Sequence, residues 1–552
     1  MQELSEYTKR HWDVVVIGGG ATGAGTLRDL AMRGVKALLL EQRDLVHGTS
    51  SRFHGLLHSG ARYAVKDAEA GRECIEENRI LRRIGKHCVE ETEGFFVRTP
   101  EDGAEFEATW VTACDKCGIE ATPISVKEAR TLEPNLAGNI VSVYRVPDSA
   151  VDGFRLVWQN VQNAVRHGAG FRTYTEVTSI NSANGQVTSV SVRDSRTGQT
   201  GEIPCSFVVN AAGSWVGGLA HTAGLDINVK PDRGTLVAFN HRFTSRVINR
   251  LRKASDGDIF VPHGSITILG TTSKKTDKPD DTVPDTAEVH DLLDIGRVLF
   301  PEIDSYRILR TFAGTRPLYT ADPSAEGRGA SRNFVVLDHE KEGLKGMATI
   351  CGGKLTTYRL MGERMADLVC TKLGVTAQCR TAVEPLVEDT PPALLERARK
   401  VFPAQGLEQA ESRLGDSFAA TVERLEAAPW KKALLCECER VTIAEFEQVA
   451  SEPTSHSLND IRRRTRMGMG TCQGSFCGLR GVGAAKLLPA GMQACGTGEC
   501  DALPCGAPDL LQSFQQERWY GIRPVLWGSE LRETELARGM YGATLNVDGA
   551  DE

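Results

Sequence analysis

The sequence predicts an α/β fold, in which a dinucleotide-binding domain with an antiparallel-sheet cap precedes a small, mainly helical domain. Three observations lead to this fold class. Residues 12–42 carry a strand, a glycine turn, a helix and a second strand in that order. Strands that run into small-residue turns recur at 206–215 and 346–354, far away along the chain. Four cysteines then stand in two close pairs after residue 430. Alternating strands and helices favour a largely parallel sheet.

The opening segment has the residue order of a βαβ unit that binds a dinucleotide. The apolar strand ends at Ile17, Gly18 allows a tight turn, and Gly20 lets the backbone approach a pyrophosphate. Gly23 lets helix and strand pack closely, and the helix N-terminus attracts the anion. Glu41 follows roughly twenty residues later, where a carboxylate meets ribose hydroxyls. A tight turn in an unrelated α/β protein is the alternative interpretation.

Length and composition describe an ordinary soluble globular protein. The 552 residues favour more than one domain, and the 41% apolar and 25% charged residues are typical values. A net charge of −7 argues against a nucleic-acid-binding protein. The sequence has no 18-residue apolar run, and its polar N-terminus does not resemble a secretory signal, so we expect a cytoplasmic location. Fifteen cysteines are many for a reducing compartment, so some should bind metal or act in redox chemistry.

The distribution of cysteines divides the chain. Strand-like stretches at 259–262 and 265–270 predict a separate sheet that caps the cofactor domain. The predicted parts are a dinucleotide-binding domain with its cap at 1–375, a helical linker at 376–430, a metal-binding domain at 431–485 and a C-terminal tail at 486–552.

Three further segments favour FAD over NAD as the dinucleotide. Hydroxyls at 49–51 can satisfy phosphate oxygens, and the strand at 176–178 can offer its backbone to an adenine edge. A helix that begins after 352–353 can direct its N-terminal dipole at the flavin. The predicted cofactor contacts beyond the first turn are Thr49, Ser50, Ser51, His58, Val177, Gly213, Gly352, Gly353 and Lys354.

Four motifs give the chain a family resemblance. They are GTSS…LLHSGARY at 48–63, VVNAAGSW at 208–215, TFAGTRPL at 311–318 and CGGKLTTYR at 351–359. Over roughly residues 10–370 the chain resembles the FAD-dependent glycerol-3-phosphate dehydrogenases, within the amino-acid-oxidase-like flavoproteins. With the cysteine-rich module, it resembles the anaerobic members. Arg52-Phe53-His54-Gly55 departs from the Ser/Lys-rich stretch of the aerobic enzymes, so no substrate contact is carried over at these four positions.

The chemistry that this resemblance implies needs a proton acceptor and cations. Oxidising a secondary alcohol removes a proton from O–H and sends a hydride to the flavin. Arg316 and Lys354 lie in the family-like motifs and are expected to bind the substrate phosphate. His58 is the favoured general base or flavin-orienting group, and His54 is the weaker alternative. The alternative interpretations are structural ion pairs for the cations and packing for the histidines.

The cysteine module has the spacing of a metal centre. Cys436 and Cys438 form a C-x-C pair, and Cys472 and Cys477 form a C-x4-C pair. Zinc sites more often use C-x2-C pairs. This spacing resembles the bacterioferritin-associated-ferredoxin-like [2Fe–2S] fold, while zinc and metal-free thiols remain alternatives. We expect glycines in this region to leave backbone N–H groups able to donate to sulfur, namely Gly468, Gly470, Gly474 and Gly478.

The other cysteines carry weaker predictions. Cys114 and Cys117 are expected to be buried or reduced thiols in a cap helix. Cys495, Cys500 and Cys505 are evenly spaced and are candidates for an accessory metal site, although three ligands without a nearby histidine argue against it.

The expected function follows from the resemblance together with the cysteine module. The chain would oxidise sn-glycerol 3-phosphate to dihydroxyacetone phosphate and pass electrons from FAD through [2Fe–2S] to partner subunits and quinone in anaerobic respiration. The resemblance implies two partners, a second soluble dehydrogenase subunit plus a membrane-anchoring iron–sulfur subunit, so the chain would be peripheral at the inner face of the cell membrane. The alternatives are a dehydrogenase of a 2-hydroxy acid, amino acid or opine, and a non-catalytic flavin and iron–sulfur relay subunit.

Overall fold

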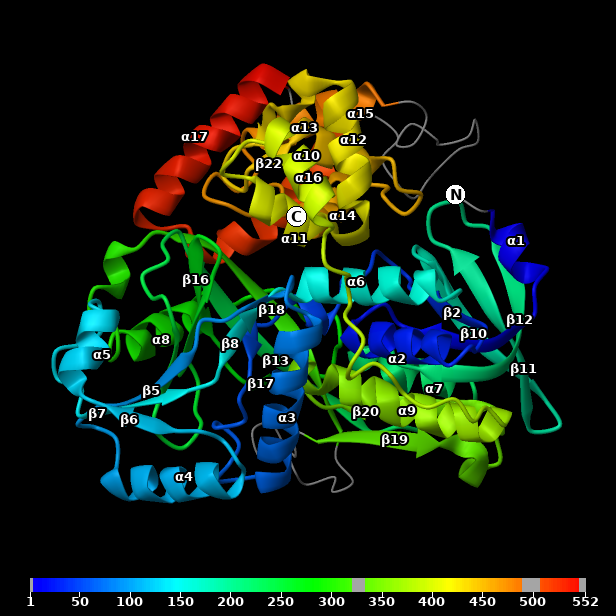
Figure 1. Ribbon diagram of the computed structural model, residues 1–552, viewed down its shortest axis with the longest axis horizontal. Coiled ribbons are helices and arrows are strands. Elements are labelled where there is room, and N and C mark those ends of the chain that lie inside the picture. The colour runs from blue at the N-terminus through cyan, green and yellow to red at the C-terminus, as the bar shows by residue number, and fades with distance from the viewer. Residues whose placement is uncertain (1–2, 320–332, 489–506, 546–552) are drawn as a thin grey trace. The chain divides into compact units, whose positions relative to one another are not determined.

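The computed structural model describes residues 3–319, 333–488 and 507–545, and the chain divides into two compact units (Figure 1). The first unit comprises Gln2–Asp194 and Gln199–Leu386. The second comprises Val387–Glu552, together with Met1 and the short segment Ser195–Gly198.

A largely parallel sheet forms the centre of the first unit. Its parallel strands pair in the order β9, β2, β1, β12 and β20, and β19 pairs antiparallel with β20 at the edge. β2 is buried along its whole length and β1 almost so, as expected for strands covered on both faces. The bounds are β1 (Trp12–Ile17), β2 (Ala37–Leu40), β9 (Gly170–Arg172), β12 (Thr200–Asn210), β19 (Phe334–Asp338) and β20 (Met347–Gly352).

Three helices pack together beside this sheet (Figure 1). They are α2 (Ala21–Met32), α6 (Gly153–Arg166) and α9 (Tyr358–Leu373). α2 and α9 meet at glycines: a Cβ added at Gly362 would lie 2.7 Å from the Gly25 carbonyl carbon. Close packing of the two helices therefore requires glycine at this crossing.

A buried arginine fastens the end of the first unit to α2. Arg28 donates to the carbonyl oxygens of Thr381 at 3.3 Å and Glu384 at 2.7 Å, and its Nε donates to Asn163 of α6 at 3.1 Å. Arg166 of α6 donates to the Leu386 carbonyl at 2.7 Å. These bonds hold the segment 381–386 on the helices, although it has no regular secondary structure.

The second sheet of this unit is the predicted cap. It is mostly antiparallel, with β14 and β5 as its parallel pair, and β13 and β18 form its longest ladder. Its strands, in sheet order, are β17 (Lys274–Lys275), β13 (Val229–Phe239), β16 (Ile266–Gly270), β15 (Ile259–His263), β14 (Val247–Arg250), β5 (Gly94–Arg98), β7 (Ser142–Val146) and β6 (Thr122–Ile124), with β18 (Ile308–Tyr319) also on β13.

Smaller elements complete the first unit. β11 (Gln186–Asp194) pairs antiparallel with the first half of β12, and β10 (Thr175–Ala183) pairs antiparallel with β11. Both strands extend the central sheet. A three-stranded sheet contains β3 (Leu56–Leu57), β8 (Ser149–Val151) and β4 (Val89–Glu90). The remaining α-helices are α1 (Leu4–Thr8), α3 (Ala68–Ile84), α4 (Ala104–Lys116), α5 (Val126–Leu132), α7 (Val216–His221) and α8 (Thr286–Gly296).

The second unit is mainly helical around a two-stranded hairpin. Its helices are α10 (Pro392–Val401), α11 (Leu407–Leu414), α12 (Phe418–Ala427), α13 (Ile443–Ala450), α14 (Leu458–Thr465), α15 (Cys477–Lys486), α16 (Ala507–Ile522) and α17 (Gly528–Leu545). The hairpin pairs β21 (Leu434–Cys436) with β22 (Val441–Thr442). Thr442 and Ser457 begin α13 and α14 with capping boxes, in which side chain and backbone N–H groups are satisfied reciprocally.

The structure divides the chain differently from the predicted boundaries at 375 and 430. The units separate between Leu386 and Val387. The helices of the predicted linker share one core with the cysteine-bearing elements: Phe402, Phe418 and Leu425 belong to the same buried cluster as Cys436 and Cys477. Residues 387–430 therefore contain three α-helices that belong to the second unit.

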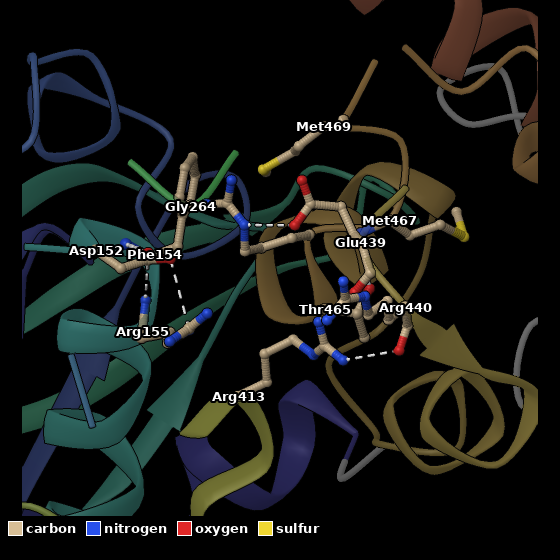
Figure 2. A network of polar contacts seen from close by, with 12 residues as sticks. Asp152, Phe154, Arg155, Gly264, Arg413, Glu439, Arg440, Thr465, Met467 and Met469 are labelled. Carbon is tan, nitrogen blue, oxygen red and sulfur yellow. Dashed lines mark hydrogen bonds and ion pairs between the residues drawn. The ribbon is translucent and has the colours of Figure 1, made fainter. Parts of the chain in front are cut away.

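One buried ion pair joins α11 to α13. Arg413 and Glu445 have side chains 1% and 0% exposed, and Nη2 of Arg413 lies 2.7 Å from Oε1 of Glu445. Arg413 also donates to the backbone carbonyls of Glu439, at 2.7 Å, and Arg440, at 3.2 Å (Figure 2). The guanidinium thus fixes the loop that follows Cys438.

The sequence prediction of the first βαβ unit is confirmed, with the helix ending at Met32 rather than near Gly34. The predicted cap strands correspond to β15 and β16. A search of the described residues finds no helix that is both long and apolar enough to cross a membrane.

Gly23→Ala is expected to destabilise the first unit. A Cβ at this position would lie 1.9 Å from the Gly18 carbonyl oxygen, so the backbone must shift. We expect a cost of about 1–3 kcal/mol and a lower thermal unfolding midpoint. Gly138→Ala is the control, because no heavy atom lies within 4 Å of its added Cβ. Equal midpoints for the two variants would contradict the packing argument.

Arg413→Met is expected to destabilise the second unit by about 3–5 kcal/mol, because the Glu445 carboxylate stays buried without its cation. The matched control is Arg397→Met, which breaks an ion pair with Glu426 whose side chains are 46% and 37% exposed. That change should cost about 1 kcal/mol or less. Denaturant unfolding followed by circular dichroism measures the free energy of unfolding of both variants. Equal losses of stability in the two variants would contradict the prediction.

Candidate cofactor cavity and thiol cluster

A cavity of about 580 Å³ opens in the first unit, where the central sheet and the cap meet. The parallel strands β1, β12 and β20 end at Ile17, Asn210 and Gly352, so their carboxyl ends share one edge of the sheet. Ligands of open α/β sheets bind outside such an edge. The cap supplies further wall residues, including Arg316 of β18.

The glycine turn is shaped by backbone contacts. Gly18 has a φ of +115°, and a Cβ there would lie 2.6 Å from the Ala211 carbonyl oxygen that follows β12. Gly18 and Gly20 line the cavity. Gly23 does not line it: its lack of a side chain lets α2 start directly against the turn. The three glycines therefore have two roles, backbone exposure and close packing.

Glu41 lines the cavity and also holds the glycine turn. Its Oε2 accepts from the Gly19 N–H at 2.7 Å, and its Oε1 accepts from the Arg43 N–H at 2.9 Å. Burial raises the pKa of the Glu41 carboxyl, and the two backbone N–H groups oppose that shift. A carboxylate in this position can still accept from a ligand, because each oxygen has more than one lone pair.

The hydroxyls at 49–51 have partners within the protein. Thr49 donates to the Thr315 carbonyl at 2.6 Å, and Ser51 donates to the Gly48 carbonyl at 3.1 Å. Ser50 Oγ accepts from the Ala21 N–H at 2.9 Å, which satisfies the first amide of α2. Thr49 and Ser50 line the cavity, whereas Ser51 lies behind it as a turn residue.

Val177 and three glycines form other parts of the wall. Val177 lies in β10 beside a bulge in its ladder with β11. Gly213, Gly352 and Gly353 have φ values of +57°, +81° and +74°. A Cβ at Gly353 would lie 2.5 Å from the sulfur of Met361, so backbone alone faces the cavity there. The turn leads through a short 3-10 segment into α9.

His58 and Lys354 come together although almost three hundred residues separate them. The backbone N–H of His58 donates to the hydroxyl of Thr356, at 3.1 Å. The hydroxyl of Tyr63 lies 3.4 Å from Nε2 of His58, and Nζ of Lys354 lies 5.1 Å from the centre of the Tyr63 ring. Sequence reasoning missed Tyr63, although it ends the quoted motif at 48–63.

Arg316 is held at the wall by the cap. It stands opposite Asp232 in the β13–β18 ladder and forms an ion pair with it. Arg316 also donates to the hydroxyl of Thr271, and to the Thr272 carbonyl at 3.0 Å. Gly234 makes room, because a Cβ there would collide with the guanidinium. Nothing in the local sequence indicated Asp232, which lies 84 residues away.

The four predicted cysteine ligands gather in the second unit. Cys436 ends β21 and Cys477 begins α15, while Cys438 and Cys472 lie in loops. Hydrogen bonds link Cys477 to Cys436 and Cys472, and Cys472 to Cys438. Gly468 and Gly470 approach the cluster, and a Cβ at Gly470 would lie 2.5 Å from the Cys438 Cβ.

The surroundings of the cluster shift the pKa values of its four thiols in opposite directions. Hydrogen bonds from Cys477 lower the pKa of Cys436 and lower the pKa of Cys472 to about 5. Burial raises the pKa of Cys438 to about 11, and its two sulfur neighbours raise the pKa of Cys477. Backbone hydrogen bonds also stabilise the thiolates, from Gly468 and Glu439 to Cys436 and from Gly474 and Phe476 to Cys472.

The remaining predicted cysteines have different outcomes. Cys114 and Cys117 are buried at the end of α4, as expected, and burial raises the pKa of both thiols. Cys495, Cys500 and Cys505 lie outside the described residues. No three His, Cys, Asp or Glu side chains within the described ranges are arranged to hold a single metal ion.

The fold and the cavity agree with comparisons to known proteins. The family model "FAD dependent oxidoreductase" matches residues 13–359. A solved structure of the glycerol-3-phosphate dehydrogenase from Bacillus halodurans, complexed with FAD, superposes with a TM-score of 0.68 at 22% identity, covering 95% of this chain and 98% of that one. At this identity the likeness shows a shared fold.

Two curated relatives, both named as the same subunit of an anaerobic glycerol-3-phosphate dehydrogenase, match almost the entire chain. The Escherichia coli protein is 44% identical over 96% of both chains. The Haemophilus influenzae protein is 40% identical over 99% of this chain and 95% of its own. The chain therefore belongs to the FAD-dependent oxidoreductases and, within them, to the family formed by this subunit of the anaerobic glycerol-3-phosphate dehydrogenases.

Proposed function

We propose that this chain is the catalytic subunit that oxidises sn-glycerol 3-phosphate to dihydroxyacetone phosphate. The observation that carries the proposal is one cavity that combines a glycine-lined cofactor edge, at Gly18 and Gly353, with two cations and an imidazole, Arg316, Lys354 and His58. Full-length relatives named as subunits of this dehydrogenase support the assignment.

The cavity residues fit FAD. Gly18, Gly352 and Gly353 expose backbone where a side chain would collide, so a flat ring and a pyrophosphate can approach closely. Glu41 stands at the position of a ribose acceptor, and Val177 offers strand backbone to an adenine. Bound FAD supplies the acceptor for the hydride that leaves the substrate carbon.

The side chains of the cap and of the turn that leads into α9 supply the rest of the chemistry. Arg316, fixed by Asp232, and Lys354 hold the phosphate dianion. His58 receives the hydroxyl proton at Nε2, beside the Tyr63 hydroxyl. With FAD bound as the hydride acceptor, loss of this proton to His58 would complete the oxidation of the alcohol to the ketone.

The thiol cluster fits a [2Fe–2S] centre better than a single metal ion. Hydrogen bonds link the four sulfurs in the order Cys436, Cys477, Cys472 and Cys438, yet no three of them are arranged around one ion position within the described residues. A binuclear centre needs only two thiolates for each iron. Backbone donors to Cys436 and Cys472 are the interactions that tune such a centre. The centre supplies one-electron transfer to a partner.

The chain is proposed to work within an assembly. Two partners, a second soluble subunit plus a membrane-anchoring iron–sulfur subunit, would receive its electrons and reduce quinone. The chain would then be peripheral at the cytoplasmic face of the membrane. Both curated relatives are named as one subunit of their enzyme, which supports a multi-subunit assembly.

Anaerobic stopped-flow absorbance tests the substrate assignment. Purified holoenzyme mixed with sn-glycerol 3-phosphate should lose its flavin band near about 450 nm, followed by slower loss of the cluster's absorption. Bleaching only by a 2-hydroxy acid, an amino acid or an opine would move the chain to a related dehydrogenase. Absence of bleaching with every substrate would favour the non-catalytic relay instead.

Lys354→Met refines this test, because it keeps the side-chain length and removes the charge beside the Tyr63 ring. We expect the substrate Kd to rise about 10- to 100-fold, as for a lost charge-assisted hydrogen bond. Lys345→Met is the control, since its side chain is 65% exposed and pairs loosely with Glu340 at 3.7 Å. An equal Kd in both variants would remove Lys354 from the phosphate site.

Cys472→Ser is expected to abolish the iron–sulfur centre while FAD remains bound. The reconstituted wild type should contain about two iron atoms per chain, and the variant close to none. Cys379→Ser is the control, because Cys379 lies in the first unit and contacts Thr381. Iron and sulfide analysis measures the difference, and tetrahedral zinc in place of iron would overturn the proposed centre.

A further inference from the structure

His54 lines the cavity. It precedes Gly55, whose φ of +86° turns the backbone sharply. As a result the N–H of Leu56 points back and donates to Nδ1 of His54 at 3.1 Å. The Gly55 carbonyl accepts from the Val151 N–H at 2.7 Å, which ties this turn to β8.

The hydrogen bond at Nδ1 fixes the tautomer of the ring. An imidazole nitrogen that accepts from an amide N–H cannot carry a proton itself, so the proton of neutral His54 resides on Nε2. Nε2 then has no lone pair with which to accept a proton. His54 is built as a hydrogen-bond donor and not as a general base.

Positive neighbours keep the ring in that neutral state. Burial, Arg62 and Arg316 lower the pKa of His54 to about 3. Arg62 contacts Asp258 at 3.1 Å and the Ser255 carbonyl at 3.0 Å, so it is fixed in place. The ring of His58 lies edge-on, with centroids 5.8 Å apart and an interplanar angle of 76°. His54 therefore protonates only as the pH falls towards that low pKa.

We propose that His54 is a specificity-determining residue, whose Nε2–H donates to a phosphate oxygen of the substrate beside Arg316. This inference rests on the proposed function, because it assumes a phosphate monoester in the cavity. A neutral donor among cations suits an oxyanion: it adds a hydrogen bond without adding a further charge that would repel Arg316 and Arg62.

The proposed donor role also distinguishes His54 from His58, the other histidine named in this part of the cavity. Nε2 of His58 lies beside the Tyr63 hydroxyl, where it can exchange a proton, while Nε2 of His54 is already protonated. The pH dependence of substrate oxidation should then be independent of His54 between about pH 5 and 8.

Two substitutions separate the acceptor function of the His54 ring at Nδ1 from its proposed donor function at Nε2. His54→Asn places an oxygen near Nδ1 and keeps the acceptor for Leu56, but it removes the donor at the ε position. His54→Gln restores an N–H near Nε2 and loses that acceptor. The perturbation of the flavin spectrum measures binding of inorganic phosphate and of glycerol to each oxidised holoenzyme. The concentration dependence of anaerobic flavin reduction gives the Kd of sn-glycerol 3-phosphate.

We expect His54→Asn to weaken binding of inorganic phosphate and of sn-glycerol 3-phosphate about tenfold and to leave glycerol binding unchanged. His54→Gln should stay within about threefold of the wild type and keep the same pH profile of flavin reduction. FAD content and the thermal midpoint show that each variant is folded.

Three results would overturn the inference. Unchanged phosphate binding in a folded His54→Asn variant would remove the donor role. Weaker binding of glycerol alone would place the ring on a substrate hydroxyl, and loss of the acid limb of the pH profile in His54→Gln would make His54 the base. If the wild-type enzyme binds phosphate but sn-glycerol 3-phosphate does not reduce it, the proposed function fails independently.

Discussion

The close contact between the Gly18 carbonyl and Gly23 is the constraint on which the first unit depends. It sets where α2 begins relative to β1, and the same turn touches the backbone after β12 at Ala211. Three chain segments therefore meet with no side chain between them. The space that they leave becomes the cofactor edge of the cavity, and every other wall element is positioned around it.

One cation of the site, Arg316, comes from the cap sheet. Strand pairing between β13 and β18 places Asp232 opposite Arg316, and the ion pair holds the guanidinium at the cavity wall. The sheet that carries the glycine-lined edge of the cavity and the sheet that presents Arg316 are thus separate structures. Such a division lets the cofactor edge stay fixed while the cap determines which substrate is accepted.

The sequence predicted those parts of the structure that depend on residues close together along the chain. The βαβ unit, the cap strands and the two cysteine pairs follow from residue types at short spacings, and the described residues contain all three. The contacts that the predictions missed join distant segments. Asp232 reaches Arg316 through a ladder, Tyr63 reaches Lys354 across the cavity, and helices α10 to α12 join the core of the thiol module. At Ser51 the sequence predicted a contact with a phosphate, whereas its hydroxyl donates to the Gly48 carbonyl within the turn.

The buried Arg28 has a consequence for how proteases meet this chain. Its bonds to the carbonyls of Thr381 and Glu384 lock the last segment of the first unit against α2, so that backbone cannot enter a protease active site without breaking them. Glu388 and Asp389, a few residues on, are exposed. Limited digestion therefore has a natural cutting point at Glu388 and Asp389, directly after the segment that Arg28 holds.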